Sequence, residues 1–138
     1  MFKKILFPID DSREAREAAK TVVNVAKTYN SDLVILSVVE TSQEGEPPKE
    51  NITVMSSPEA VSELLQQAQK AFNQEGINTE IIEKEGVPSF TICDVADEME
   101  VDLIIMGCRG LGLTEQGVSE SVANRVINLS PCPVLIVP

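Results

Sequence analysis

The chain has 138 residues, 43% hydrophobic and 24% charged, with a formal net charge of −11 at pH 7. This length suits one domain, 1–138, with a substantial core. The acidic net charge argues against binding to nucleic acid or to an anionic membrane, because such binding needs clustered Lys and Arg on the protein surface. No apolar run approaches the roughly 20 residues that cross a bilayer. In the segment MFKKILFPID, two lysines are followed by too few apolar residues for a signal peptide, so we expect a cytoplasmic protein.

The composition also excludes several kinds of catalytic and metal site. Histidine is absent, which removes Ser-His-Asp triads, Cys-His dyads and imidazole metal ligands. Three cysteines without C-x-x-C spacing indicate neither a disulfide framework nor a zinc site. We interpret Cys93 as a core residue rather than a reactive thiol. Cys108 follows a glycine near an expected helix start, where a thiol pKa can fall, but a small filler residue is the preferred interpretation.

Five short apolar runs alternate with four segments of helical periodicity along the chain. Strands are expected at 3–8, 33–39, 77–84, 101–106 and 134–137, and helices between 12 and 29, 57 and 76, 88 and 99, and 118 and 129. The last helix should bury a stripe made of Val118, Val122, Val126 and Leu129. Residues 40–57 form a long polar loop, which suits either a lid or contact surface or an inert excursion.

This alternation predicts an α/β fold, an open five-stranded parallel sheet with helices on both faces. Right-handed crossovers make it doubly wound, and the order 3-2-1-4-5 places the switch point between the first and fourth strands. The last strand would then be an apolar edge. Pairing of Val134–Val137 with the same strand of a second copy would cover it, so we expect a homodimer.

Two features would meet at that switch point. A loop carrying Gly107, Gly110 and two further glycines follows the fourth strand and precedes a helix, an arrangement that can surround an anion with backbone N–H groups. A flexible connection that needs glycine only for its turns is the alternative interpretation. Asp10 follows the first strand, where it either caps a helix or binds a ribose hydroxyl.

Three segments together resemble the universal stress protein family of the single-domain UspA type: KKILFPIDDSREAREAA, GVPSFTICDVADEMEVDLIIMGCRG and SVANRVINLSPCPVLIVP. The resemblance covers the whole chain and implies a Rossmann-like fold related to adenine-nucleotide α-hydrolases. It implies that Asp10 takes the ribose, that the Val38 backbone lies near adenine, and that phosphates sit in the glycine loop. The implied cofactor-binding set is Pro8, Ile9, Asp10, Val38, Met106, Gly107, Arg109, Gly110, Ser121 and Val122.

One departure from the family pattern concerns the phosphate loop, which in ATP-binding members reads G-x2-G-x9-G-[S/T]. The position of the third glycine holds Glu120, followed by Ser121. An inward carboxylate about 4 Å from a phosphate would repel it by about 4 kcal/mol at an effective dielectric near 20. Three alternatives remain. The Glu120 side chain turns to solvent, a Mg²⁺ ion bridges its carboxylate and a phosphate, or the carboxylate lies in the first turn of the helix and is stabilised by the helix dipole.

Two functions of different class therefore remain open. In the first, the chain is a stress-response sensor that binds ATP, AMP or a cyclic nucleotide, with or without Mg²⁺, and signals through its homodimer to an unknown regulatory protein. In the second, it is a nucleotide-free interaction module of the same fold. An enzymatic function ranks third: no general base is evident, and Arg109 alone would stabilise charge without activating water, so a slow ATPase is the most that is expected.

Overall fold

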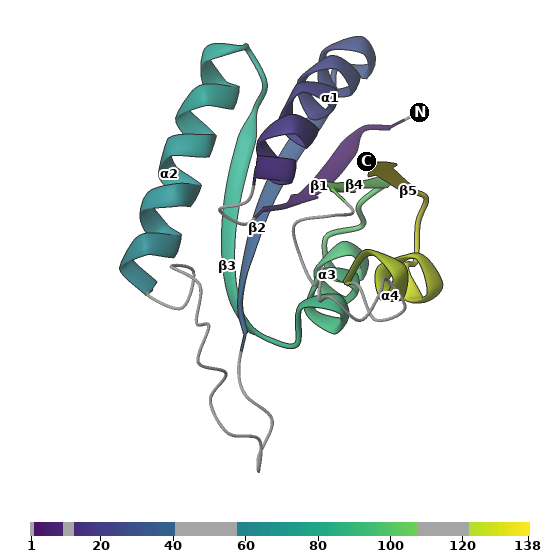
Figure 1. Ribbon diagram of the computed structural model, residues 1–138. Coiled ribbons are helices and arrows are strands. Elements are labelled where there is room, and N and C mark those ends of the chain that lie inside the picture. Colours follow the sequence, from purple (N-terminus) through teal and green to yellow (C-terminus); the bar gives the residue numbers. More distant parts are fainter. Residues whose placement is uncertain (1, 10–12, 41–57, 108–121) are drawn as a thin grey trace.

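The computed structural model describes residues 2–9, 13–40, 58–107 and 122–138, and their strands form a five-stranded parallel sheet (Figure 1). The strand order is β3-β2-β1-β4-β5, as the sequence predicts. In chain order the elements are β1 (Lys4–Pro8), α1 (Arg13–Tyr29), β2 (Asp32–Glu40), α2 (Pro58–Gln74), β3 (Thr79–Gly86), α3 (Pro88–Glu98), β4 (Leu103–Gly107), α4 (Val122–Leu129) and β5 (Val134–Val137).

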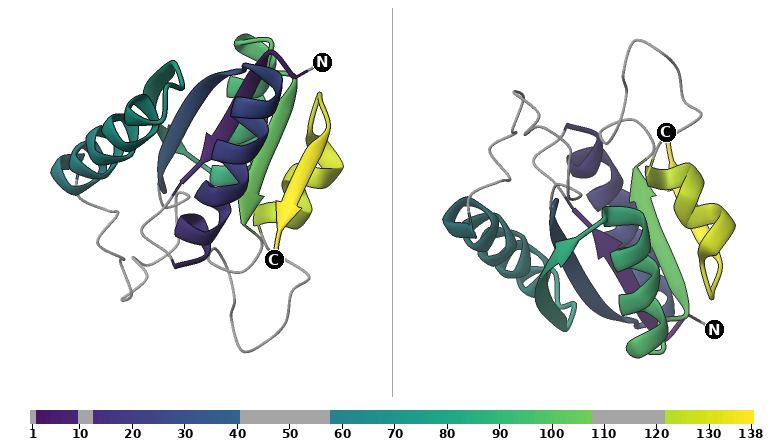
Figure 2. Two further views of the ribbon diagram at one scale, coloured as in Figure 1. Left: turned by 90° about the horizontal axis from the view of Figure 1, so that it is seen from above. Right: turned by 90° about the horizontal axis from the view of Figure 1, so that it is seen from below.

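Two helices cover each face of the sheet (Figure 2). Successive residues of a strand point to opposite faces, so β1 sends Ile5 and Phe7 toward α1 and α2 and sends Leu6 toward α3 and α4. All three of these side chains are at most 2% exposed. This two-sided burial explains why the inner strands appear in the sequence as continuous apolar runs.

The third strand differs from its predicted bounds of 77–84. β3 runs from Thr79 to Gly86 because its ladder with β2 begins at Leu33↔Thr79 and ends at Glu40↔Gly86. Ile77 precedes the strand and fills the core instead, with 4% of its surface exposed. The ladder is set by where β2 lies, which the local apolar pattern does not encode.

The predicted stripe of the last helix is wrong at Leu129, which is 49% exposed. Ala123 and Val126 are the buried residues of α4, and Val122 is half-buried. Helix α4 packs against α3 and the edge strand β5. Strand β5 is at the edge of the sheet formed by the described strands, so α4 packs at the side of the sheet rather than over its centre. Val118 lies outside the described residues.

The two edge strands differ in character. Strand β3 carries the exposed residues Glu80, Glu83, Lys84 and Glu85, and such charges discourage pairing with another chain. Strand β5 is entirely apolar, and Leu135 is 37% exposed. Within the described part of the chain, no helix is long and apolar enough to cross a membrane.

Candidate functional site

The sheet separates into two halves between β1 and β4. Strand β1 stays with β2 as far as Pro8↔Leu36, and the Ile9 N–H then donates to the Leu36 carbonyl at 2.8 Å. Strand β4 stays with β5 as far as Gly107↔Val137. The β1–β4 ladder of the described strands ends earlier, at Leu6↔Ile104. The carboxyl ends of β1 and β4 therefore part at the topological switch point, where open α/β sheets bind ligands.

A clamp at the opposite end of these strands holds β1 and β4 together. The Asp102 carboxylate accepts the backbone N–H groups of Lys3 and Lys4 at 3.0 and 3.1 Å. The Asp102 N–H donates to the Lys4 carbonyl at 2.9 Å, and the Lys4 ammonium donates to the Met99 carbonyl at 3.2 Å. The amino ends are thus fixed while the carboxyl ends diverge. Sequence reasoning missed this role, because Lys3 and Asp102 are remote along the chain.

Four described members of the predicted site lie where β1 and β4 separate. Pro8 ends β1 and Ile9 follows it, while Met106 and Gly107 end β4. Met106 is 1% exposed, so its side chain is not accessible to a ligand. The half-buried Val38 lies two residues beyond Leu36, the partner of Pro8.

These residues provide an apolar setting. Val38, Met106 and Val122 all belong to the cluster under α3 and α4, whereas Ile9 belongs to the cluster under α1 and α2. Backbone groups and apolar side chains of this kind suit the edge and faces of a purine ring. The remaining candidates, Asp10, Arg109, Gly110 and Ser121, lie outside the described residues, as do Cys108 and Glu120.

Two buried hydroxyls near this region have no hydrogen-bond partner within the described structure. Ser37 is 0% exposed and lies in β2 directly before Val38. Ser89 is 1% exposed and shares the inner stripe of α3 with Ile92 and Cys93. An unpaired buried hydroxyl costs about 1–3 kcal/mol. The sequence did offer a signal for Ser37, a lone hydroxyl in the apolar run LVILSVV, which sequence reasoning did not use.

The described cysteines behave as core residues. Burial raises the pKa of the Cys93 thiol, and Asp94 and Cys132 raise it further. Burial also raises the pKa of Cys132, although hydrogen bonds from Ser130 and the Ile104 backbone oppose it. Cys93 is 9% exposed and belongs to the core cluster under α3 and α4, which confirms its interpretation as a core residue. The described residues contain no group of three or more acidic or Cys side chains able to hold a metal ion.

Comparison with known proteins gives one consistent result. Residues 1–138 match the model of the universal stress protein family. Universal stress protein Sll1654 of Synechocystis is 61% identical over all of this chain and 87% of its own length. The solved structure of UspA from Lactobacillus plantarum superposes with a TM-score of 0.83 at 26% identity, over 99% of this chain and 98% of that one. A universal stress protein solved in complex with cAMP superposes with a TM-score of 0.78 at 22% identity, over 99% and 97%.

Proposed function

Because the chain belongs to the universal stress protein family, we propose that it is a cytoplasmic stress-response regulator that binds an adenine nucleotide. The proposed site lies where the carboxyl ends of β1 and β4 part. That separation is the observation that carries the proposal, since it occurs at the switch point of the sheet. A protein of the same fold holds cAMP, so the fold accommodates this class of ligand.

The roles of individual residues follow from their positions in the chain. Asp10 comes directly after the β1 end at Pro8–Ile9, where its carboxylate would take the ribose hydroxyls. The backbone near Val38 would take the adenine edge. The segment after Gly107, which includes Arg109, Gly110 and Ser121, would surround the phosphates up to Val122, the first residue of α4.

Glu120 is expected to shift the preference away from triphosphate. Its carboxylate replaces the glycine of the ATP-binding pattern, one residue before Ser121. A like charge at about 4 Å costs about 4 kcal/mol, which corresponds to roughly a thousandfold in affinity. AMP and cyclic nucleotides carry less charge and lose less. Bound Mg²⁺ between the carboxylate and a phosphate would reverse this preference.

Titration calorimetry tests the proposal directly. Wild type is titrated with ATP, AMP and cAMP, with and without Mg²⁺, after any co-purified nucleotide has been identified by mass spectrometry. We expect AMP or cAMP to bind more tightly than ATP, and Glu120→Gly to bind ATP at least a hundredfold more tightly. Glu115→Gly removes the same charge from the same segment and should change little. Tight ATP binding by wild type would refute the role of Glu120.

Signalling through a homodimer is the second part of the proposal. Strand β5 is an apolar edge with Leu135 exposed, and pairing with its copy would cover both. Leu135→Glu is expected to give a monomer in sedimentation experiments. Phe90→Glu, at a 53% exposed position on α3, is the matched control and should remain dimeric. Dimeric Leu135→Glu protein would contradict the proposed interface.

An interaction module without nucleotide is the alternative function. The observations that favour it are the net charge of −11 and the carboxylate at position 120. If neither wild type nor Glu120→Gly binds any of the three nucleotides, this alternative replaces the sensor. Hydrolysis of ATP is expected to be slow at most, and an unknown regulatory protein remains the proposed partner in both cases.

A further inference from the structure

Pro8 is a proline in an inner strand of the sheet. It ends β1, which has β2 on one side and β4 on the other. Proline has no backbone N–H and cannot donate to a ladder, so in sheets it is normally confined to edge strands, strand starts or bulges. Pro8 nevertheless keeps its pairing with Leu36 of β2. Its effect on the sheet depends on which neighbouring strand its backbone groups face.

The hydrogen bonds around β1 show which neighbour each residue faces. The Ile9 N–H donates to the Leu36 carbonyl of β2 at 2.8 Å. The Lys4 carbonyl instead accepts the Asp102 N–H at 2.9 Å, on the side of β4. Alternate residues of a strand direct their backbone groups to alternate neighbours. The backbone groups of Pro8, like those of Lys4, therefore face β4.

Strand β4 presents the matching groups to β1. The Ile104 N–H donates to the Pro133 carbonyl at 3.0 Å, on the side of β5, so by the same alternation Ile105 faces β1. The ladder between the two strands reaches Leu6↔Ile104. Its next step requires an N–H at position 8 to donate to the Ile105 carbonyl. Pro8 lacks that N–H, and its ring occupies the place of the missing hydrogen.

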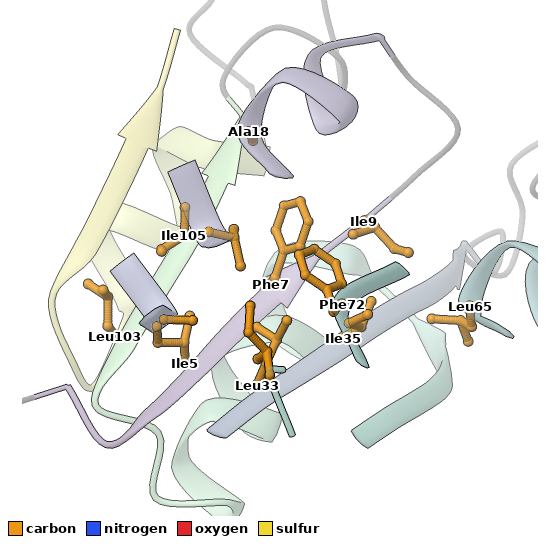
Figure 3. Packing of buried hydrophobic residues seen from close by; sticks show 13 residues of the cluster. Ile5, Phe7, Ile9, Ala18, Leu33, Ile35, Leu65, Phe72, Leu103 and Ile105 are labelled. Carbon is orange, nitrogen blue, oxygen red and sulfur yellow. The ribbon is translucent and has the colours of Figure 1, made fainter. Parts of the chain in front are cut away.

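Side-chain packing does not account for the end of the ladder. Phe7 and Ile105 would form the next pair, and both belong to one core cluster, in which they are 2% and 0% exposed. Figure 3 shows them in the same layer as Ile5 and Leu103, which do pair in the ladder. The two strands thus lie side by side at this level, and their pairing stops where the donor is missing.

We propose that Pro8 is a positioning residue, whose missing N–H ends the β1–β4 ladder early and holds the carboxyl ends of both strands open for the nucleotide. In a continued ladder the Gly107 N–H would donate to the carbonyl of residue 8. The described ladder joins neither group, so the Gly107 N–H can serve a phosphate oxygen and the Pro8 carbonyl a ligand hydroxyl. This inference rests on the proposed function, because it names what keeps that site open.

Pro8→Ala tests the proposal by supplying the missing N–H. Amide hydrogen exchange followed by NMR should find the new N–H at position 8 protected, because it bonds to the Ile105 carbonyl. Calorimetry should show AMP affinity reduced at least about tenfold, the loss of one hydrogen bond to a charged group. The urea midpoint should stay near that of wild type, because the added bond offsets the greater freedom of the unfolded chain. An unprotected amide, or wild-type AMP affinity alongside a protected one, would overturn the proposal.

Two controls isolate the missing donor. Lactic acid at position 8, introduced by cell-free translation, has the side chain of alanine but an ester oxygen in place of the N–H, and should bind AMP as wild type does. Pro88→Ala makes the same exchange at the first position of α3, where a helix leaves the N–H unpaired, and should change AMP affinity little.

The pattern of losses separates this inference from the proposed function. If the lactic acid chain lost as much AMP affinity as Pro8→Ala, the proline ring rather than its missing donor would matter, and the proposal would be overturned. If wild type itself bound no nucleotide, the proposed function would fail. Protection of the amide at position 8 would then still decide whether Pro8 ends the ladder.

Discussion

Replacing Asp102 with alanine is expected to destabilise the fold by loosening the junction of β1 and β4. The side chain accepts two backbone N–H groups, from Lys3 at 3.0 Å and Lys4 at 3.1 Å. These N–H groups precede or open β1, and the β1–β4 ladder that follows ends at Leu6↔Ile104. The clamp therefore supplies a large part of the hydrogen bonding that joins the two halves of the sheet.

The magnitude follows from the environment of each bond. Hydrogen bonds to charged groups contribute about 1.5–3 kcal/mol each. The hydrogen bond from the Lys3 N–H is exposed, so its contribution lies at the lower end of this range, because water can replace the carboxylate in the variant. The hydrogen bond from the Lys4 N–H is partly buried. We expect a loss of about 3 kcal/mol in the free energy of unfolding. For a chain of 138 residues this lowers Tm by about 10 °C.

Urea unfolding followed by circular dichroism measures the effect. Asp102→Asn keeps one acceptor oxygen but loses the charge, so its free energy of unfolding should fall between those of wild type and Asp102→Ala. Asp97→Ala removes an exposed carboxylate from α3 and should change stability by less than about 0.5 kcal/mol. If Asp102→Ala matched the Asp97 control, the clamp would contribute nothing and the reasoning would be refuted.

Three further predictions concern buried or strained positions. Ser37→Ala and Ser89→Ala should each raise the free energy of unfolding by about 1 kcal/mol, because each removes an unpaired buried hydroxyl; a loss in urea unfolding would contradict this. Gly86→Ala should cost about 2 kcal/mol, since Gly86 has φ +151° and an added Cβ would lie 2.6 Å from Thr91 Oγ1; Thr91→Ala should restore only the steric part of that loss in a double-mutant cycle. Burial raises the pKa of Cys93 above its ordinary 9.0, so the unfolded thiol ionises first and stability should fall as pH rises through that value; Cys93→Ala should flatten this slope in urea midpoints taken on either side of it.

The local sequence pattern was sufficient to predict the helices and strands and their order along the chain. The apolar runs that became β1, β2 and β4 are buried on both faces, so their composition alone identifies them as inner strands. The strand order follows from the handedness of parallel crossovers together with the family resemblance. The family resemblance, rather than the pattern, supplied most of the described site candidates, and the structure places Pro8 and Gly107 at the carboxyl ends of their strands. The roles of those residues remain predictions.

Tertiary structure decided the features that depend on how segments distant in sequence meet. Ile77 is in the core but outside β3, and Leu129 is exposed although it continues the helical stripe, because neighbouring elements set both outcomes. The Asp102 clamp follows from where β1 lies relative to β4. A sequence encodes which faces of its elements are apolar, but the spacing between two packed helices depends on all the side chains beneath them.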